Sequence, residues 1–230
     1  MNIKTATREF LGSYEISEAA RYLCPDIHLV NAGYKIHTAN IIRWIRQGLA
    51  DPSLIEVPGR QMMITFEDLI SMRVVAFLRA LNYSFPEIRK AEKLLRKNTG
   101  HVRPFATESI WAEKKGALHI FAEIYSILLA ANKGGQLAFI EMVRGNLINV
   151  HGLSFDHRGV AYTWTPRHNI LLHPRIQFGR SCILGTRIPT YDIAGMVESG
   201  DSVEFLSDSY QIPKEQIQSA VDWEKEIAAS

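Results

Sequence analysis

Apolar residues recur at helical spacing near the start of the chain. In YEISEAARYL, residues 14–23, Ile16, Ala20 and Leu23 fall on one side of a helix. Ser17 can cap this helix, because its hydroxyl can accept a hydrogen bond from a free amide of the first turn. The pattern predicts a short amphipathic helix in this segment.

A second helix is predicted over HTANIIRWIRQGLA, residues 37–50. Thr38 can cap its N-terminus, and Gly48 can adopt the left-handed conformation that ends a helix. The face that is expected to point inward carries Ile41, Ile42 and Ile45.

The opposite face of this second helix is polar. At 100° per residue it carries Asn40, Arg43 and Gln47, with Trp44 at its edge. Amide and guanidinium groups on one exposed face can read base edges or contact phosphates. An ordinary solvated face explains the same pattern equally well, so this helix alone leaves both interpretations open.

The next elements complete a winged helix-turn-helix order. Apolar segments on both sides of Pro58-Gly59 predict a short hairpin, with Arg60 at or near its tip. An apolar helical stripe then runs from Phe66 to Leu81. A capping-box pattern and a proline in the first turn mark a further helix over SFPEIRKAEKLLRK, residues 84–97.

The rest of the chain predicts shorter elements. Between Thr107 and Pro166 we expect a hairpin around residues 114–117, a helix within residues 135–148 and strands on both sides of DHRG, residues 156–159. Packed short helices follow, with Phe205 and Trp223 expected in their core. The predicted fold class is mainly α with small β elements (α+β). We expect a DNA-binding unit over residues 1–104, an α+β connector over 105–168 and a helical helix-turn-helix unit over 169–230.

Charge is distributed unevenly along the 230 residues, although the net charge is only +2. Met1–Pro104 carries 15 basic against 10 acidic side chains, and Phe105–Ser230 carries 11 against 14. A basic N-terminal half suits a phosphate-binding surface, whereas the acidic balance of the second half argues against DNA contact there. With 47% hydrophobic and 22% charged residues, the chain can bury a core and remain soluble.

Candidate catalytic chemistry is sparse. Four histidines of the second half are separated by six, eleven and five residues, which matches no zinc-site spacing; they are His151, His157, His168 and His173. The sequence has no nucleophile motif and no phosphate-binding glycine loop. We therefore expect no enzymatic activity, no metal site and no cofactor.

The sequence predicts a cytoplasmic protein that does not enter a membrane. Its longest apolar runs, such as IYSILLAA at residues 124–131, are shorter than the ~18–20 residues that span a bilayer. Its N-terminus shows no signal-peptide pattern. Cys24 and Cys182 are far apart in sequence and define no disulfide framework.

The segments YEISEAARYL, IIRWIRQGL, ITFEDL and FLRALNYSFPEIRKAEKLL resemble the successive parts of a MerR-type DNA-binding domain, over Ser13 to Lys97. Two departures are the long connection CPDIHLVNAGYKI and Asn82 in place of the family's glycine. The resemblance implies DNA contacts from the second helix and the wing. The expected DNA-binding residues are Lys35, His37, Thr38, Asn40, Arg43, Trp44, Gln47 and Arg60.

The segment from His173 to Trp223 resembles a small prokaryotic domain with the pattern H-P-x-x-x-x-G-x-P-x-I-x-G-T-R-[IV]-P. Ser181 stands where that family commonly has proline. The domain is associated with operons that encode toxins resembling PIN-domain ribonucleases, and its combination with a MerR-like half resembles larger VapB-type antitoxins. The expected toxin-binding residues are Arg180, Arg187 and Tyr191. Each arginine could equally brace its own loop through backbone carbonyls.

These observations predict the antitoxin of a type II toxin–antitoxin system. It would bind operator DNA to repress its own operon and would neutralise a cognate PIN-domain ribonuclease toxin. A homodimer is expected, because repressors of this kind usually pair two half-sites. The alternative is a stand-alone MerR-like transcriptional regulator whose middle region binds a small effector.

Overall fold

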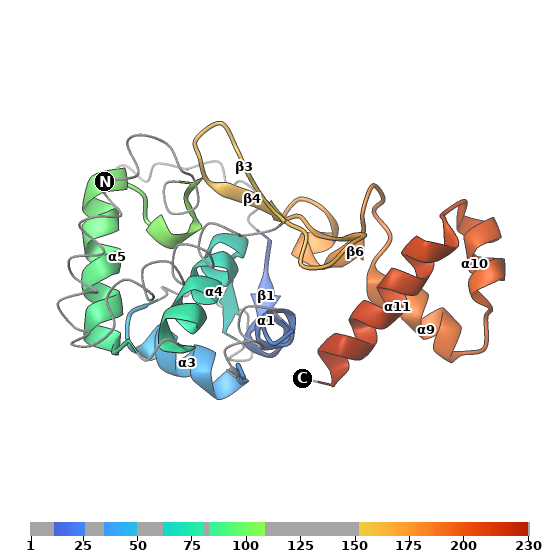
Figure 1. Cartoon of the computed structure of the whole chain (residues 1–230), viewed down its shortest axis with the longest axis horizontal. Helices are drawn as coiled ribbons and strands as arrows, with labels where there is room; N and C mark the ends of the chain where they lie inside the picture. The colour runs from blue at the N-terminus through green and yellow to red at the C-terminus, as the bar shows by residue number, and fades with distance from the viewer. Residues whose placement is uncertain (1–11, 26–34, 50–61, 81–82, 109–151, 230) are drawn as a thin grey trace, which may run out of the picture.

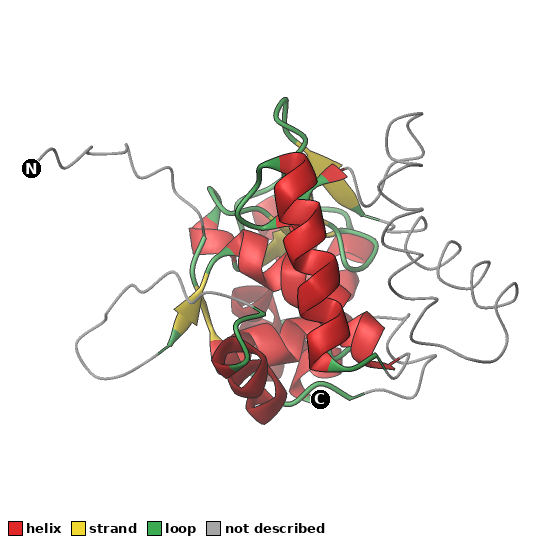
Figure 2. Ribbon diagram, turned by 90° about the vertical axis from the view of Figure 1, so that its left-hand side faces the viewer, coloured by secondary structure: helices red, strands yellow, loops and turns green. Residues whose placement is uncertain are grey.

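The computed structural model of the protein describes residues 12–25, 35–49, 62–80, 83–108 and 152–229. These residues form seven α-helices, two short 3-10 helices and two small antiparallel sheets. Helices predominate and strands are short, as the view from the side of α5 shows (Figure 2). The expected fold class, mainly helical α+β, is confirmed.

The first four helices lie at one end of an elongated molecule (Figure 1). The elements of this part are β1 Tyr14–Glu15, α1 Ile16–Leu23, α3 Thr38–Arg46, β2 Met63–Ile64, α4 Phe66–Ala80, α5 Phe85–Thr99 and the 3-10 helix Pro104–Ala106. Helix α1 packs against α3, and β1 pairs with β2 in antiparallel register.

Two of the predicted helix caps are wrong. Helix α1 begins two residues earlier than expected, so Ser17 lies inside its first turn and Glu15 occupies the N-cap position. His37, not Thr38, caps α3, and its backbone N–H donates to Asn40 Oδ1 at 2.8 Å. Each helix begins directly after a residue with an extended backbone, which is Glu15 for α1 and His37 for α3. The spacing of apolar side chains does not reveal which residue has this conformation.

The N-terminal cap of α5 is as predicted. Ser84 is the N-cap, its backbone N–H donates to Glu87 Oε2 at 2.6 Å, and Pro86 lies in the first turn. The helix ends at Gly100, whose φ of +69° lies in the left-handed region that glycine tolerates. The predicted hairpin tip at Pro58-Gly59 lies outside the described residues.

Helix α4 is buried around nearly its whole circumference, more than the stripe in its sequence indicates. Asp68 on its first turn is fully buried. Its carboxylate accepts hydrogen bonds from the backbone N–H of Thr65 at 3.0 Å, from the Thr65 hydroxyl at 2.8 Å and from Nε of the buried Arg103. This buried ion pair joins the start of α4 to the segment that follows α5.

A four-stranded antiparallel sheet lies between the two groups of helices (Figure 1). Its strands, in spatial order, are β3 Leu153–Phe155, β4 Ala161–Trp164, β5 Ile170–Leu172 and β6 Ser181–Ile183. The strands predicted on both sides of residues 156–159 are confirmed as β3 and β4. The expected boundary at 168/169 falls between β4 and β5, which are neighbours in this sheet. The hairpin expected at 114–117 and the helix expected within 135–148 lie outside the described residues.

Three helices form the C-terminal end of the molecule: α9 Thr190–Glu198, α10 Val203–Tyr210 and α11 Lys214–Ala228. Their small core consists of Ile183, Ile193, Leu206, Ile212, Ile217, Ala220 and Val221. Trp223 is buried as predicted, but it belongs to the larger core shared with the N-terminal helices. Phe205 is 57% exposed, so its predicted burial is wrong: it lies on the outer side of α10, while Leu206 faces the core. None of the described helices is long and apolar enough to cross a membrane.

The buried ion pair predicts a large loss of stability in Asp68→Ala. The substitution removes the carboxylate that pairs with the buried guanidinium group of Arg103, so we expect a loss of about 3–5 kcal/mol in the free energy of unfolding. Chemical denaturation of the purified protein measures this. Glu204→Ala, which breaks an exposed pair with Lys214, is the control and should change the unfolding midpoint little. Equal effects of the two substitutions would contradict the assigned role of Asp68.

Candidate functional site

The outer face of α3 is exposed and polar, as the sequence predicts. Lys35, His37, Thr38 and Arg43 are exposed, whereas Asn40 and Gln47 are half-buried. Trp44 is only 1% exposed and belongs to the main core, which corrects its expected position at the edge of the polar face. Its indole is therefore not available for a DNA contact. Arg60 lies outside the described residues.

Arg46, one turn after Arg43, extends the basic face and was missed from the sequence. Its side chain is exposed. The spacing of three residues places it beside Arg43 on the helix surface, and this spacing is the signal that could have identified it. Asn40 stabilises the N-terminus of α3, because its side-chain oxygen accepts a hydrogen bond from the backbone N–H of the N-cap residue His37.

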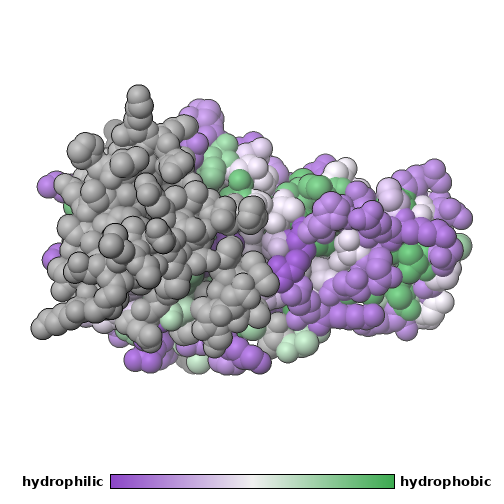
Figure 3. Space-filling model, in the orientation of Figure 1, coloured by the Kyte–Doolittle hydropathy of each residue, from purple (hydrophilic) through white to green (hydrophobic). Residues whose placement is uncertain are grey.

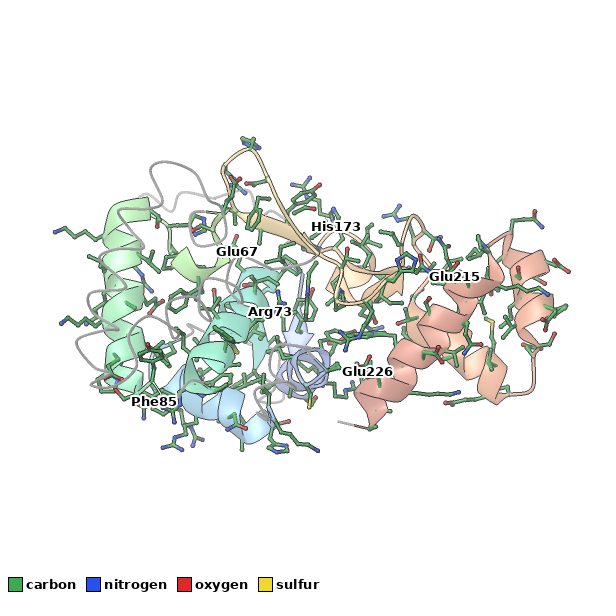
Figure 4. The ribbon with its side chains drawn as sticks, in the orientation of Figure 1. Glu67, Arg73, Phe85, His173, Glu215 and Glu226 are labelled. Atoms are coloured by element: carbon green, nitrogen blue, oxygen red, sulfur yellow. The ribbon has the colours of Figure 1, made fainter. Side chains whose placement is uncertain are left out.

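The guanidinium group of Arg43 is held by a neighbouring ring. Its Cζ lies 5.3 Å from the centroid of the Phe85 ring, which comes from the first turn of α5 (Figure 4). Arg79 Cζ lies 4.6 Å from the same centroid, and Arg89 Nη1 donates to the backbone carbonyl of Gln47 at 3.2 Å. Cation–π contacts of this kind restrict a long flexible side chain. The end of α3 and the start of α5 thus form one basic surface.

A second exposed basic surface lies around β6, because Arg180 directly precedes this strand and Arg187 follows it. Arg180, Arg187 and Tyr191 are all exposed, and Arg180 Cζ lies 5.7 Å from the centroid of the Tyr191 ring. Among the described residues, neither arginine side chain forms an ion pair or donates a hydrogen bond. Other groups brace the loop: Gln177 Nε2 donates to the carbonyl of Arg187 at 3.0 Å, and the Thr186 hydroxyl donates to that of Ile183 at 2.9 Å. Among the described residues, the side chains of Arg180 and Arg187 therefore donate no hydrogen bond to a backbone carbonyl that would brace the loop.

A hollow of about 700 Å³ lies beside this second surface, between α1 and the C-terminal helices. Residues of both halves of the chain line it: Ser13, Glu15, Glu18, Arg21, Tyr22, Met63, Gln177, Phe178, Arg180, Tyr191, Glu224 and Ile227. In Figure 3, polar side chains cover most of the visible surface of the C-terminal part, with apolar patches between them. The lining of the hollow is mixed, with three glutamates and two arginines beside the aromatic and apolar side chains.

Hydroxyl groups connect two glutamates beneath this hollow. The Tyr22 hydroxyl donates to Glu18 Oε1 at 2.9 Å and accepts from the backbone N–H of Ser181 at 3.3 Å. The Ser181 and Thr190 hydroxyls lie 2.7 Å apart, and Thr190 donates to Glu224 Oε1. Burial raises the pKa of both glutamates, because desolvation disfavours the charged carboxylate more than these hydrogen bonds favour it.

The histidines are dispersed among the described residues. His157 and His173 line a smaller hollow of about 290 Å³, together with Glu67 and Tyr162. Burial lowers the pKa of His173, whose Nδ1 accepts from the backbone N–H of Arg175 at 3.0 Å. His168 lies elsewhere, with Nε2 3.5 Å from Glu215 Oε1, and His151 lies outside the described residues. The described part of the chain contains no group of three or more potential ligand side chains that could hold a metal ion.

Residues 170–223 match a protein family described as a protein of unknown function, DUF433. This segment runs from β5 into α11 and therefore includes the second basic surface. It spans less than a quarter of the chain, so the match concerns this segment alone. No curated protein matches the chain.

A solved structure, the X-ray crystal structure of Rv2018 from Mycobacterium tuberculosis, resembles the whole chain. The TM-score is 0.67 at 20% sequence identity, and the match covers 91% of this chain and 96% of that chain. At this identity the likeness establishes a shared fold. The C-terminal segment and the N-terminal helices therefore occur together in another protein of the same architecture.

The buried glutamates predict a pH-dependent stability. Because the pKa of Glu224 is raised in the folded protein, the folded state binds its proton more tightly than the unfolded state does. Stability should therefore fall as the pH rises from the ordinary value of 4.5 through the raised pKa. Glu224→Gln removes the charge and keeps the oxygen that accepts from Thr190.

We expect Glu224→Gln to make the unfolding midpoint less dependent on pH above pH 4.5 than it is in the natural protein. Thermal unfolding at several pH values measures this, with Glu198→Gln, at an exposed glutamate, as the control. An unchanged pH profile in the Glu224 variant would show that this carboxyl group is solvated as in the unfolded chain.

Proposed function

We propose that the protein is the antitoxin of a type II toxin–antitoxin system. In this proposal it represses its own operon by binding operator DNA and blocks a PIN-domain ribonuclease toxin. The observation that carries the proposal is the presence of two separate, exposed arginine pairs, Arg43 with Arg46 and Arg180 with Arg187. None of the four forms an ion pair among the described residues.

The operator would bind at α3. The resemblance to MerR-type domains assigns α3 to the major groove, and its packing against α1 leaves the basic face outside. Phe85 holds the Arg43 guanidinium near the surface, so less side-chain freedom is lost when the arginine reaches a phosphate or a base edge. A homodimer would present two such helices to two half-sites.

The ribonuclease would bind at the second basic surface. PIN-domain ribonucleases, by family resemblance, gather carboxylates around a divalent metal ion. An arginine guanidinium pairs with a carboxylate through two parallel hydrogen bonds, which an ammonium group cannot reproduce. Among the described residues no carboxylate lies within ion-pair distance of Arg180 or Arg187, and Glu18 interacts with Arg180 only at longer range, so both guanidinium groups keep donors for the carboxylates of a partner.

One observation favours the alternative, a MerR-like regulator that responds to a small effector. The hollow of about 290 Å³ at the β3–β4 turn is lined by Glu67, Tyr162 and His173 and is large enough for a small molecule. Figure 4 labels Glu67 and His173. The neighbouring gene discriminates between the two functions. An antitoxin copurifies with the product of that gene, whereas a stand-alone regulator does not.

Arg43→Ala should weaken operator binding by about 1–3 kcal/mol, which corresponds to roughly 5–150-fold. Binding should also weaken steeply with salt, because each neutralised phosphate releases counterions. Electrophoretic mobility shifts with the protein's own promoter fragment measure both effects. Arg187→Ala removes an exposed arginine from the other surface and is the control. A normally folded Arg43→Ala protein that binds the fragment as tightly as this control would contradict the assignment of α3.

Replacing both Arg180 and Arg187 with alanine should weaken neutralisation of the ribonuclease by roughly 30-fold or more. Loss of one side of a buried charge pair costs about 2–5 kcal/mol. Lysines at both positions should restore inhibition only in part. The measurement is ribonuclease inhibition beside thermal unfolding, with Arg43→Ala as the control that retains inhibition. Full inhibition by a stable double-alanine variant would assign the contact to another surface.

A further inference from the structure

The three C-terminal helices carry a strong negative charge. Residues 190–229 contain nine aspartates and glutamates against two lysines, which gives a net charge of −7. These helices lie at the end of the elongated molecule opposite α3 and α5 (Figure 1). A surface of this charge repels nucleic acid and attracts cationic partners.

Helix α10 exposes an aromatic ring within this acidic region. Leu206 points into the small core of the three helices, whereas Glu204, Phe205 and Asp208 are exposed. We call these three exposed residues the α10 face. The Phe205 side chain is 57% exposed and has no ring or cation–π contact in the described part of the chain. Asp208, three residues further along the helix, is its neighbour on the helix surface.

The position of Asp208 is unfavourable for the helix itself. It lies in the last turn of α10, where the helix dipole disfavours a negative charge, and Glu204 four residues earlier adds like-charge repulsion. Lys214 Nζ lies 3.0 Å from Glu204 Oε1, but within the described ranges no cation lies within ion-pair distance of Asp208. Natural proteins break such local rules mainly at functional surfaces. The charge of Asp208 therefore points to a partner outside this chain.

We propose that the α10 face docks on the cationic, RNA-binding surface of the ribonuclease, with Phe205 as its apolar centre. This inference rests on the proposed function and adds a contact separate from Arg180 and Arg187. Charge complementarity selects the occupant, because an enzyme that binds a polyanionic substrate presents a cationic surface to it. The carboxylates of α10 take the place of RNA phosphates there. An exposed aromatic ring supplies the kind of side chain that contributes most at the centre of an interface.

The first test reverses one charge of the α10 face. Asp208→Lys should weaken ribonuclease binding at least about tenfold, mainly through slower association, because exposed charges steer the encounter of two proteins. Asp222→Lys is the matched control, since Asp222 is exposed on α11, forms no ion pair among the described residues and gives the same change in net charge. Surface plasmon resonance with purified ribonuclease, at low and high salt, gives the rate constants.

The control variant should bind as the natural chain does. Asp208→Lys should also make association less dependent on salt than it is in the natural chain. Equal weakening by the two lysine variants would show a general effect of net charge and overturn the assignment of the α10 face.

Two further variants separate a binding role from a folding role. Phe205→Ala should raise the dissociation rate at least about tenfold, as expected for a central aromatic residue. Asp208→Asn removes the unfavourable charge, so its thermal unfolding midpoint should equal or exceed that of the natural chain while ribonuclease binding weakens. A lowered midpoint in Phe205→Ala, or unchanged binding in either variant, overturns the proposal and leaves the antitoxin function intact. Failure of the natural chain to bind the ribonuclease overturns both.

Competition with RNA identifies the surface of the ribonuclease that is covered. The natural chain should displace a fluorescein-labelled oligoribonucleotide, as measured by fluorescence anisotropy with the divalent metal ion chelated to prevent cleavage. Phe205→Ala and Asp208→Lys should require at least about tenfold more protein, whereas Asp222→Lys should not. Binding of RNA and the natural chain to the ribonuclease at the same time would overturn the proposed occupant.

A second copy of this chain is the other occupant that charge permits, because its α3 face is basic. Light scattering of the free protein at low salt distinguishes it. A head-to-tail assembly that Asp208→Lys dissociates, with ribonuclease binding unchanged, would assign the α10 face to self-association and overturn the proposal.

Discussion

The placement of Tyr22 joins the two halves of the molecule, and the rest of the structure depends on it. Its ring stacks on Trp223 of α11, with centroids 6.1 Å apart, and meets Tyr14 edge-on at the same distance. Its hydroxyl donates to Glu18 within α1 and accepts from the backbone N–H of Ser181 at the start of β6. One buried side chain thus contacts the N-terminal strand, the first helix, the sheet and the last helix.

This junction explains why the second basic surface is not built from the C-terminal segment alone. The segment that matches the family of unknown function contributes Phe178, Arg180 and Tyr191. Ser13 and Tyr14 supply hydrogen bonds to the turn at residues 177–179, and the helix α1 supplies the other wall of the hollow. A surface made in this way depends on the relative placement of both halves, so a change in either half can alter it.

The two arginine surfaces are organised by the same physical means. In each, an aromatic ring lies under a guanidinium group: Phe85 under Arg43, and Tyr191 under Arg180. Stacking restricts the flexible side chain while its donors remain available to solvent, because the ring occupies only the face of the planar group. Such preparation reduces the entropy that is lost when an anionic partner binds.

Local signals in the sequence determined the helices, the strands around residues 156–159 and the cap of α5. Their hydrogen bonds join residues only a few positions apart, so spacing and residue type suffice to predict them. The basic face of α3 was visible for the same reason. The burial of Trp44 at the edge of this face was not predicted, because a helical projection gives the direction of a side chain but not which other elements cover it. Phe205 was predicted to be buried and is exposed. Its apolar character alone does not reveal that no other element packs on its side of α10.

Only the tertiary structure decided the features that join distant segments. The pairing of β1 with β2, the position of β4 beside β5, and the contact of Tyr22 with Ser181 and Trp223 all depend on long-range packing. The turn at Phe178 is the clearest example. Nothing in the local sequence favours a left-handed phenylalanine, and hydrogen bonds from residues 165 positions away hold it there.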